Sequence, residues 1–286
     1  MVSVLDPDVD LVRRITSAWA RDAVMFVETL TDIDPSWGSE TFELADGAAV
    51  LCGPGLYVNR AIGAGHDRPL SDDEWELLEA RSAAVGVPAT IEITEVSHPA
   101  VRAAAQDRGY EIDHEESALA RPTDLSDVPP PDPGFEIVPA NRGLLPLWQE
   151  TTACGWGHEG EGARRASDAF ARVAAVVDGE RFTLVRHAGS GRPLGCASMS
   201  IRDGVATLGG MSTLPEARGQ GVQTALIRHR LRVAAASGCD LATSVAAPGG
   251  ISERNLLRHG FERVFTIEHW VRRSNPCSNP ASEEEP

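Results

Sequence analysis

The most informative stretch of the chain is Arg218-Gly219-Gln220-Gly221-Val222-Gln223. An apolar run from Val205 to Leu214 precedes it, and apolar residues at helical spacing begin at Val222. Glycines let the backbone approach a ligand closely, and the first N–H groups of a helix have no partner inside the helix. The helix dipole also favours negative charge at that end. A strand, a glycine turn and a helix start therefore predict an anion site suited to a pyrophosphate.

The common phosphate-binding motifs do not fit this turn. No Lys-Ser or Lys-Thr follows the glycines, as a P-loop would require, and the three-glycine dinucleotide fingerprint is absent. The remaining pattern, Arg-x-x-Gly-x-Gln, resembles the Gln/Arg-x-x-Gly-x-Gly/Ala turn of the GNAT acetyltransferase superfamily. The alternative interpretation is a glycine turn that caps a helix and binds no ligand.

Further segments resemble the same family in the same order. Met211 to Pro215 resembles the strand and proline before the turn, Leu241 to Ala247 a later strand, and Ser252 to His259 the helix after it. Gly260-Phe261 resembles the Gly-Phe pair before the last strands of the family. The resemblance covers about Phe135 to Arg272. It implies binding of acetyl-CoA, or a related acyl-CoA, as a co-substrate.

The resemblance also implies roles for the backbone around the turn. Met211 to Thr213 would pair with the pantetheine arm, and one of their N–H groups would polarise the thioester carbonyl. The N–H groups from Arg218 to Thr224 would receive the pyrophosphate. The predicted cofactor-binding residues are Met211, Ser212, Thr213, Arg218, Gly219, Gln220, Gly221, Val222, Gln223, Thr224 and Asn255.

Three positions depart from the family pattern. Gln223 replaces the small last residue of the turn, where its side chain either crowds the phosphate or donates an amide hydrogen bond to it. Leu256 stands where many members carry the tyrosine that protonates the leaving thiolate, and Gly249 where an asparagine often contacts CoA. The acid therefore stays unassigned, with Asn255, Ser252 or water as substitutes.

The predicted catalytic residues are His158 and Glu159. They lie between two predicted helices, Leu144 to Thr152 and Ala163 to Val173, in a connection that borders the acceptor pocket in the family. An imidazole titrates near neutrality, as a general base requires. A surface loop without function is the alternative. Cys154 with His158 also suggests a nucleophilic pair, but no third group orients it, and the family uses direct attack.

Composition limits the class of protein. The 286 residues are 42% hydrophobic, enough for one large domain or two ordinary ones. A net charge of −16 argues against a nucleic-acid partner and is compatible with a cationic amine, or simply with an acidic surface. We expect no membrane span and no signal peptide. The five cysteines lack metal-ligand spacing, which predicts reduced thiols in a cytoplasm and no metal. The absence of lysine, with abundant alanine, suggests a GC-rich bacterial gene.

The two halves of the chain look related. Pro122 to Gly134 is proline-rich and reads as a linker. A shift of about 151 positions places Gly109-Tyr110-Glu111 on Gly260-Phe261-Glu262, and a predicted helix and strand of one half on those of the other. We predict an α/β (α+β) fold with two GNAT-like domains, each a mixed, mainly antiparallel sheet flanked by helices. The predicted division is a degenerate domain at 1–121, a linker at 122–134, a catalytic domain at 135–273 and a flexible tail at 274–286.

The same shift predicts that the first half lacks a CoA site. Residues 67–72 correspond to the glycine turn, but they contain no glycine, lose an N–H at Pro69 and carry carboxylates. Arg60 to Gly65 matches the family pattern literally, but we interpret it as a chance match within a strand. The first half is then expected to cover one side of the substrate cleft or to pack for stability.

These observations predict an acyltransferase that moves an acetyl group from acetyl-CoA to a primary amine of a small molecule, in a ternary complex. The alternative is a non-catalytic acyl-CoA-binding or regulatory protein, favoured by Leu256 and by the degenerate first half. Transfer of another acyl group, or transfer to a protein amino terminus, is a third hypothesis.

Overall fold

A computed structural model of the chain describes residues 8–56, 58–140, 143–157, 161–174, 176–177 and 181–273. The N-terminal half forms α1 (Val9–Ile33), η1 (Pro35–Trp37), β1 (Glu40–Leu44), β2 (Gly47–Leu51), β3 (Arg60–Ile62), α2 (Asp72–Ala84), β4 (Ala89–Ile93), α3 (Pro99–Asp107) and β5 (Glu111–Pro122).

The C-terminal half forms β6 (Phe135–Pro139), α4 (Leu145–Trp156), α5 (Glu161–Ala174), β7 (Arg181–His187), β8 (Pro193–Arg202), β9 (Val205–Thr213), η2 (Pro215–Ala217), α6 (Val222–Ala236), β10 (Leu241–Ala246), α7 (Ile251–Arg258) and β11 (Glu262–Arg272). The strands and helices predicted for this half are confirmed, with ends that differ by one or a few residues. Arg60–Ile62 is a strand, as predicted for the literal motif match in the first half.

The last four elements of each half follow one another in the same order. α2, β4, α3 and β5 correspond to α6, β10, α7 and β11, and their first residues lie about 151 positions apart. The helices begin differently. α2 has Ser71 as its N-cap and a capping box with Glu74, whereas α6 follows Gly221 with no side-chain cap.

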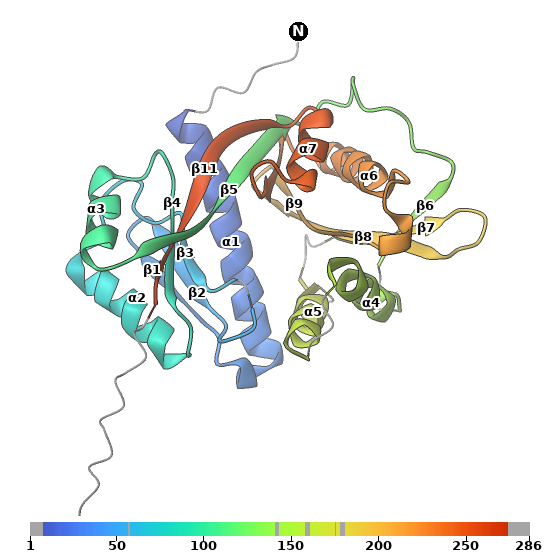
Figure 1. The fold of residues 1–286 in the computed structure, drawn as a ribbon. Coiled ribbons are helices and arrows are strands. Elements are labelled where there is room, and N and C mark those ends of the chain that lie inside the picture. Colours follow the sequence, from blue (N-terminus) through green and yellow to red (C-terminus); the bar gives the residue numbers. More distant parts are fainter. Residues whose placement is uncertain are drawn as a thin grey trace, which may run out of the picture.

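All of these strands belong to one eleven-stranded sheet, in the order β1-β2-β3-β4-β11-β5-β10-β9-β8-β7-β6. β11 lies between β4 and β5, and β5 lies between β11 and β10, with antiparallel pairing at each contact. Each half therefore inserts its last strand between the last two strands of the other half (Figure 1). The division at 1–121 and 135–273 stays a prediction about the sequence halves, because the sheet is shared.

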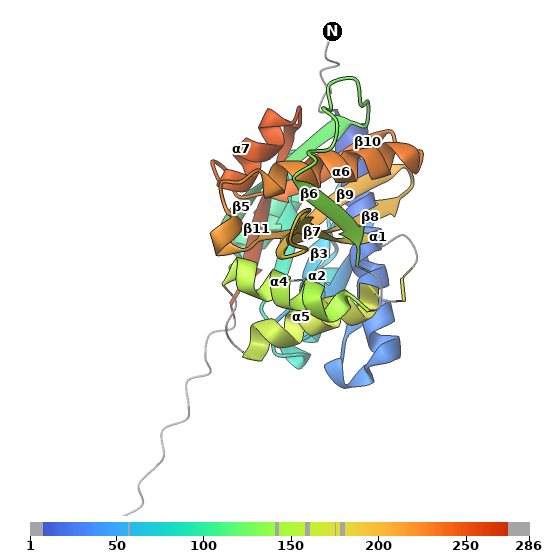
Figure 2. The same cartoon turned by 90° about the vertical axis from the view of Figure 1, so that its right-hand side faces the viewer.

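Helices cover both faces of this sheet. Figures 1 and 2 show α6 and α7 on one side of the C-terminal strands, and α4 and α5 on the other. α2 packs through Trp75 and Leu78 onto the N-terminal strands. The buried residues of α2 are Trp75, Leu78 and Ser82, which are three and four positions apart and so lie on one side of the helix. The described helices include none that is long and apolar enough to cross a membrane.

α1 spans the junction between the halves. Val12 and Ile15, near its start, pack with Ile267 of β11 over the exchanged strands. Val27 and Leu30, near its end, pack with β2, β3 and α5. Asp8 caps the helix by accepting the Leu11 N–H at 2.8 Å. One long helix thus covers the face of the sheet on which both halves meet.

Candidate active site

Two neighbouring strands separate within the C-terminal half. β9 and β10 are parallel partners only as far as Thr207 and Thr243. Beyond that pair both strands continue, but they no longer pair with each other. The Ser244 hydroxyl donates to the Leu208 carbonyl at 2.7 Å where the strands part. The sheet is therefore open between these strands, and a ligand can lie along the edge of β9 like an added strand.

β9 carries a β-bulge beside this opening. Ala197 of β8 faces both Gly210 and Met211, because the register shifts between the pairs made by Cys196 and Ser198. Gly210 has φ 53°, and a Cβ atom there would lie 2.4 Å from the Ser198 Oγ. The position therefore requires glycine, and the bulge turns the main chain of Met211 out of the regular ladder.

An arginine from α6 supports the bulge from within the core. Nη1 of Arg230 donates to the carbonyls of Ser198 and Gly209, each at 3.0 Å. Its Nη2 lies 3.1 Å from the sulfur of Met211. Burial lowers the pKa of Arg230 to about 9, so the guanidinium is still charged at neutral pH. A fixed positive charge therefore lies behind the strand edge beside the opening.

The turn after β9 leaves backbone donors open to solvent. Gly219 and Gly221 have φ of 75° and 86°, in the left-handed region that favours glycine, and both are exposed. Within the described residues, no acceptor is hydrogen-bonded to the N–H groups of Gly219, Gly221, Val222, Gln223 or Thr224. Donors that converge at the start of a helix suit a phosphate, because the helix dipole adds to them.

The side chain of Gln223 points away from these donors. Its Oε1 accepts a hydrogen bond from Asn255 of α7, and the Asn255 Oδ1 accepts one from Arg258 at 2.9 Å. The turn is also tied to α4, since Nη2 of Arg218 donates to the Gly155 carbonyl at 3.0 Å. The structure therefore brings the predicted CoA-binding residues together, with Gln223 held toward α7 rather than across the amides.

A cavity of about 240 Å³ adjoins the opening between β9 and β10. Its floor includes Gly209 and Val245 from the two separated strands and Glu116 from β5. α1 and α5 contribute to its walls. The apolar lining comes mainly from Trp19, Phe26, Val58, Phe170, Val173 and Phe182. Both halves of the chain therefore line it; we call it the seam cavity.

Three carboxylates line the seam cavity, and two of them pair with arginine. Asp22 of α1 lies 2.8 Å from Arg202 and accepts a hydrogen bond from the Ser200 hydroxyl. Burial nevertheless raises the pKa of Asp22. Glu92 of β4 forms an ion pair with Arg60 of β3.

Glu116, the third carboxylate, has a histidine as its direct partner. Its Oε2 lies 3.1 Å from Nε2 of His269 on β11. Burial alone would raise the pKa of Glu116, but the hydrogen bond with His269 and nearby positive charge lower it overall. Glu116 is therefore ionised at neutral pH, and its side chain is 29% exposed, which leaves it accessible from the cavity.

Residues 143–261 match the family model described as acetyltransferase (GNAT) family. The C-terminal half is a GNAT domain. A GCN5-related N-acetyltransferase from Kribbella flavida shares the fold over 93% of this chain and 96% of its own, with a TM-score of 0.64 and 20% identity. No curated protein matches the chain significantly.

Two further solved structures cover both halves. A tandem GNAT protein from the clavulanic acid biosynthesis pathway matches 95% of this chain and 98% of its own, with a TM-score of 0.61 and 16% identity. A conserved protein of unknown function from Staphylococcus epidermidis matches 84% and 96%, with a TM-score of 0.60 and 12% identity. These similarities are to the fold, and they confirm the predicted tandem GNAT arrangement.

The predicted catalytic residues of the GNAT domain, His158 and Glu159, lie outside the described residues. Just before them, Trp156 donates from Nε1 to the Met211 carbonyl at 3.0 Å, so the end of α4 meets the bulge. The Cys154 sulfur lies 3.4 Å from Glu150, and this contact raises the pKa of the thiol. Cys154 is therefore held as a thiol, which removes support for a cysteine nucleophile.

The position of the usual GNAT acid supplies no proton donor. Leu256 of α7 is 1% exposed and packs in the core with Ile227, Leu231 and Phe261. Its neighbour Asn255 is bonded to Gln223 and Arg258, as described above. Neither residue is arranged to protonate a leaving thiolate.

Two histidines lie close to Glu116, a grouping of side chains that occurs at metal sites. Ligand atoms of His114, Glu116 and His269 lie within 4.8 Å of one another. However, the two imidazoles are stacked, with centroids 4.1 Å apart and planes 10° apart. A metal bound about 2.0 Å from a ring nitrogen lies near the plane of that ring, so it cannot lie in both stacked planes. The stacked imidazoles therefore do not fit a shared metal ion.

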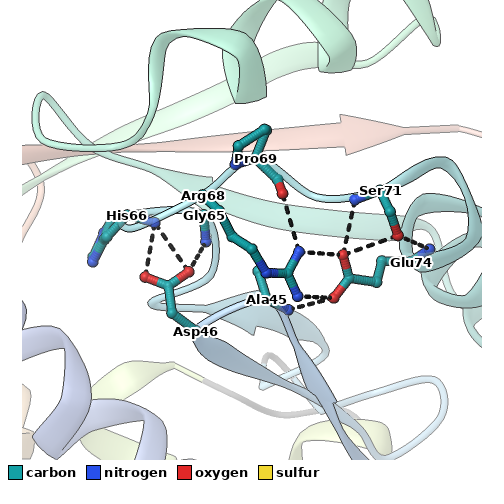
Figure 3. Close-up of polar contacts among 8 residues, drawn as sticks. All are labelled: Ala45, Asp46, Gly65, His66, Arg68, Pro69, Ser71 and Glu74. Atoms are coloured by element: carbon teal, nitrogen blue, oxygen red, sulfur yellow. Dashed lines mark hydrogen bonds and ion pairs between the residues drawn. The ribbon is translucent and has the colours of Figure 1, made fainter.

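The turn of the N-terminal half is closed by the protein's own carboxylates (Figure 3). Asp46, in the turn between β1 and β2, accepts the N–H groups of Gly65, His66 and Asp67 at 2.7, 3.0 and 2.9 Å. An internal carboxylate thus occupies donors of the segment that leads into α2.

A second carboxylate closes the start of α2. Glu74 accepts the N–H groups of Ser71 at 2.8 Å and Ala45 at 2.7 Å, and pairs with the guanidinium of Arg68 (Figure 3). These contacts strongly lower the pKa of Glu74, the ion pair with Arg68 first. The N–H groups from Gly65 to Asp67 and that of Ser71 therefore already have carboxylate acceptors, which favours the prediction that this half holds no CoA.

Proposed function

We propose that this protein transfers an acetyl group from acetyl-CoA to a primary amine of a small molecule, by direct attack in a ternary complex. The observation that carries the proposal is the continuous path from the opened strands to the open turn. The edge of β9 beyond Thr207 is free of β10, and the chain then runs to the turn before α6, where five N–H groups have no acceptor among the described residues. Pantetheine and pyrophosphate need such an edge and such donors in this order.

The chemistry then follows from charge. As the amine attacks the thioester carbon, negative charge develops on the carbonyl oxygen, and we expect an N–H group from Met211 to Thr213 to stabilise it. Arg230 adds its charge from behind the bulge. The C–N bond forms, the C–S bond breaks, and the thiolate takes the proton released by the attacking nitrogen. Leu256 provides no acid, so that proton moves directly or through water.

A binding measurement tests the first step of the proposal, the binding of acetyl-CoA at the turn before α6. A valine at Gly221, whose φ is 86°, should distort the turn and displace donors from the pyrophosphate. Loss of two charge-assisted hydrogen bonds lowers acetyl-CoA affinity about 100-fold or more. Calorimetry with acetyl-CoA measures this, and one site per chain is expected, since the first half is closed.

Gly238→Val is the matched control. Gly238 lies just after the opposite end of α6, has φ 77° and is exposed, so its replacement carries similar backbone strain without touching the turn. Equal affinity of the Gly221→Val and wild-type proteins would refute the turn as the phosphate site. Two acetyl-CoA molecules per chain would refute the closed first half.

The alternative, an acyl-CoA-binding regulator without catalysis, is favoured by the buried Leu256. A thiol-release assay with acetyl-CoA and a panel of primary amines separates the two. Release above the rate of hydrolysis with at least one amine establishes transfer. Tight binding of acetyl-CoA without release for any amine supports the regulator.

A further inference from the structure

We propose that the seam cavity binds the acceptor as a primary ammonium ion on an apolar carbon skeleton, and that Glu116 of the N-terminal half receives its proton. This inference rests on the proposed acetyl transfer and deepens it. It also gives the N-terminal half a direct role at the reacting nitrogen.

Position is the first argument. Glu116 lies on β5, the strand that the N-terminal half inserts beside β10. In the antiparallel pairing of these strands Ala118 is opposite Val245, and side chains alternate along a strand, so Glu116 shares the face of Val245. Gly209 of the separated strand lines the same cavity. A molecule in the cavity therefore touches Glu116 at one side and the opened strands at the other.

Charge is the second argument. Asp22 and Glu92 are compensated by Arg202 and Arg60, whereas the direct partner of Glu116 is His269. Among the carboxylates that line the described part of the cavity, Glu116 therefore has a histidine rather than an arginine as its direct partner. A partly buried carboxylate of this kind is stabilised by a nearby counter-ion, and an ammonium ion supplies one.

The apolar lining limits the rest of the molecule. The walls contributed by α1 and α5 present Trp19, Phe26 and Phe170, and Phe26 and Phe170 stack at 4.5 Å between centroids. Such walls favour an aliphatic or aromatic skeleton and disfavour a polyol, whose hydroxyl groups would lose their water without replacement.

The proton balance is simple. The ammonium N–H bond breaks and a Glu116 O–H bond forms, which frees the lone pair for attack on the thioester carbon. The second proton leaves the nitrogen during C–N bond formation and goes to the thiolate. Glu116 then returns its proton to solvent. The His269 N–H holds Glu116 in place and keeps it ionised, so His269 is a positioning residue.

Binding tests the ammonium site without turnover. With CoA present, calorimetry should show 2-phenylethylammonium bound at least 10-fold more tightly than 2-phenylethanol, which has a similar shape and no charge. Glu116→Gln should remove most of that difference. Glu115→Gln is the matched control, because Glu115 is the exposed neighbour on the same strand and its side chain faces the other side. Equal binding of the two compounds to the wild-type protein would overturn the site.

Kinetics test the proton transfer. Glu116→Gln should lower kcat/KM for 2-phenylethylamine about 100-fold, as expected for loss of a general base, while acetyl-CoA affinity stays unchanged. 2-Phenylethylamine should also exceed glucosamine in kcat/KM at least 10-fold. Wild-type kcat/KM in a folded Glu116→Gln protein would refute the role of Glu116 and leave acetyl transfer standing. Failure of the wild-type protein to bind acetyl-CoA would instead refute the proposed function.

The pH profile of kcat/KM distinguishes a positioning role of His269 from a purely structural one. The charged and titratable groups around Glu116 are His269, His114, Arg60, Glu92 and Asp22. His269→Gln removes a hydrogen-bond partner that lowers the pKa of Glu116, so the acid limb of kcat/KM should move to higher pH. Glu116→Gln should abolish the limb that moves. An acid limb that stays at the same pH in His269→Gln would contradict the assignment.

Discussion

The two halves place a turn before a corresponding helix, and they differ in what satisfies the backbone donors of that turn. In the N-terminal half, Asp46 and Glu74 accept N–H groups before and at the start of α2. In the C-terminal half, the N–H groups from Gly219 to Thr224 include five without a partner in the described chain. Carboxylates of the protein thus accept backbone N–H groups before and at the start of α2, and a phosphate binds donors of the same kind at the start of a helix.

The comparison shows how an anion site is lost without loss of the fold. In α2 the residue before the helix is Ser71 and the third helical residue is Glu74. In α6 the corresponding residues are Gly221 and Thr224. A capping box stabilises its own helix and consumes the donors. The C-terminal half leaves its helix start uncapped and keeps the donors for a ligand.

The largest expected effect comes from placing a carboxylate in the turn from Gly219 to Thr224, where the N–H donors are open. Thr224→Glu puts an acid at the position of Glu74, where it can reach back to the N–H groups at the start of α6 and repel the diphosphate. Acetyl-CoA affinity should fall about 100-fold, because charge-assisted contacts are lost and like charges approach. Calorimetry measures the affinity.

Thr224→Gln is the control for this change, because it adds the same length without charge. The Thr224→Glu protein should unfold at the same temperature as the wild type or higher, since an acid in the first turn favours the helix. Affinity that falls equally in both variants would show that size, rather than charge, closes the turn.

The second expected effect comes from removing the carboxylate of Asp46, which accepts N–H groups in the segment before α2. Asp46→Ala leaves the donors of Gly65 and His66 without their acceptor, although both residues are buried. The free energy of unfolding should fall by about 1–2 kcal/mol, measured by urea denaturation. Glu43→Ala, an exposed change in the same hairpin, is the control. Sulfate should restore part of the loss if the three donors then form an anion site; a Glu43→Ala loss as large as that of Asp46→Ala would contradict the role of Asp46.

Local patterns in the sequence predicted most of the fold. The glycine turn, the alternating strands and the offset of about 151 positions are short-range signals, and the helices and strands of the C-terminal half follow them. The exchange of β5 and β11 was not predicted, because each strand would look the same in isolation whichever neighbour it has. Pairing between strands so distant in the chain leaves no local pattern.

The sequence predicts the parts of the site that are continuous in the chain, but not those that distant elements bring together. The predicted CoA-binding turn is one continuous stretch, and its N–H donors are open in the described chain; its ligand stays a proposal. The seam cavity was missed, because Asp22, Glu116 and His269 come from three distant elements. The sequence predicts the base at His158 and Glu159 in the C-terminal half, whereas we propose Glu116, on a strand that the other half supplies. The signal that was available is the carboxylate of Glu116 in a strand that is otherwise buried toward its end.

The smallest expected effect concerns Glu74 and its dependence on pH. Glu74→Gln weakens the ion pair with Arg68 and the contacts with Ser71 and Ala45, and should cost about 1 kcal/mol of stability at pH 7. The folded state lowers the pKa of Glu74 from its ordinary value of 4.5. The stabilisation is therefore complete above about pH 4.5 and is lost as the pH falls below it, because the unfolded chain takes up the proton first. Urea denaturation of the two proteins from pH 7 to pH 3 should show a gap that narrows in acid. A gap that stays constant, or widens, would mean that the shape of Glu74 rather than its charge closes the N-terminal turn.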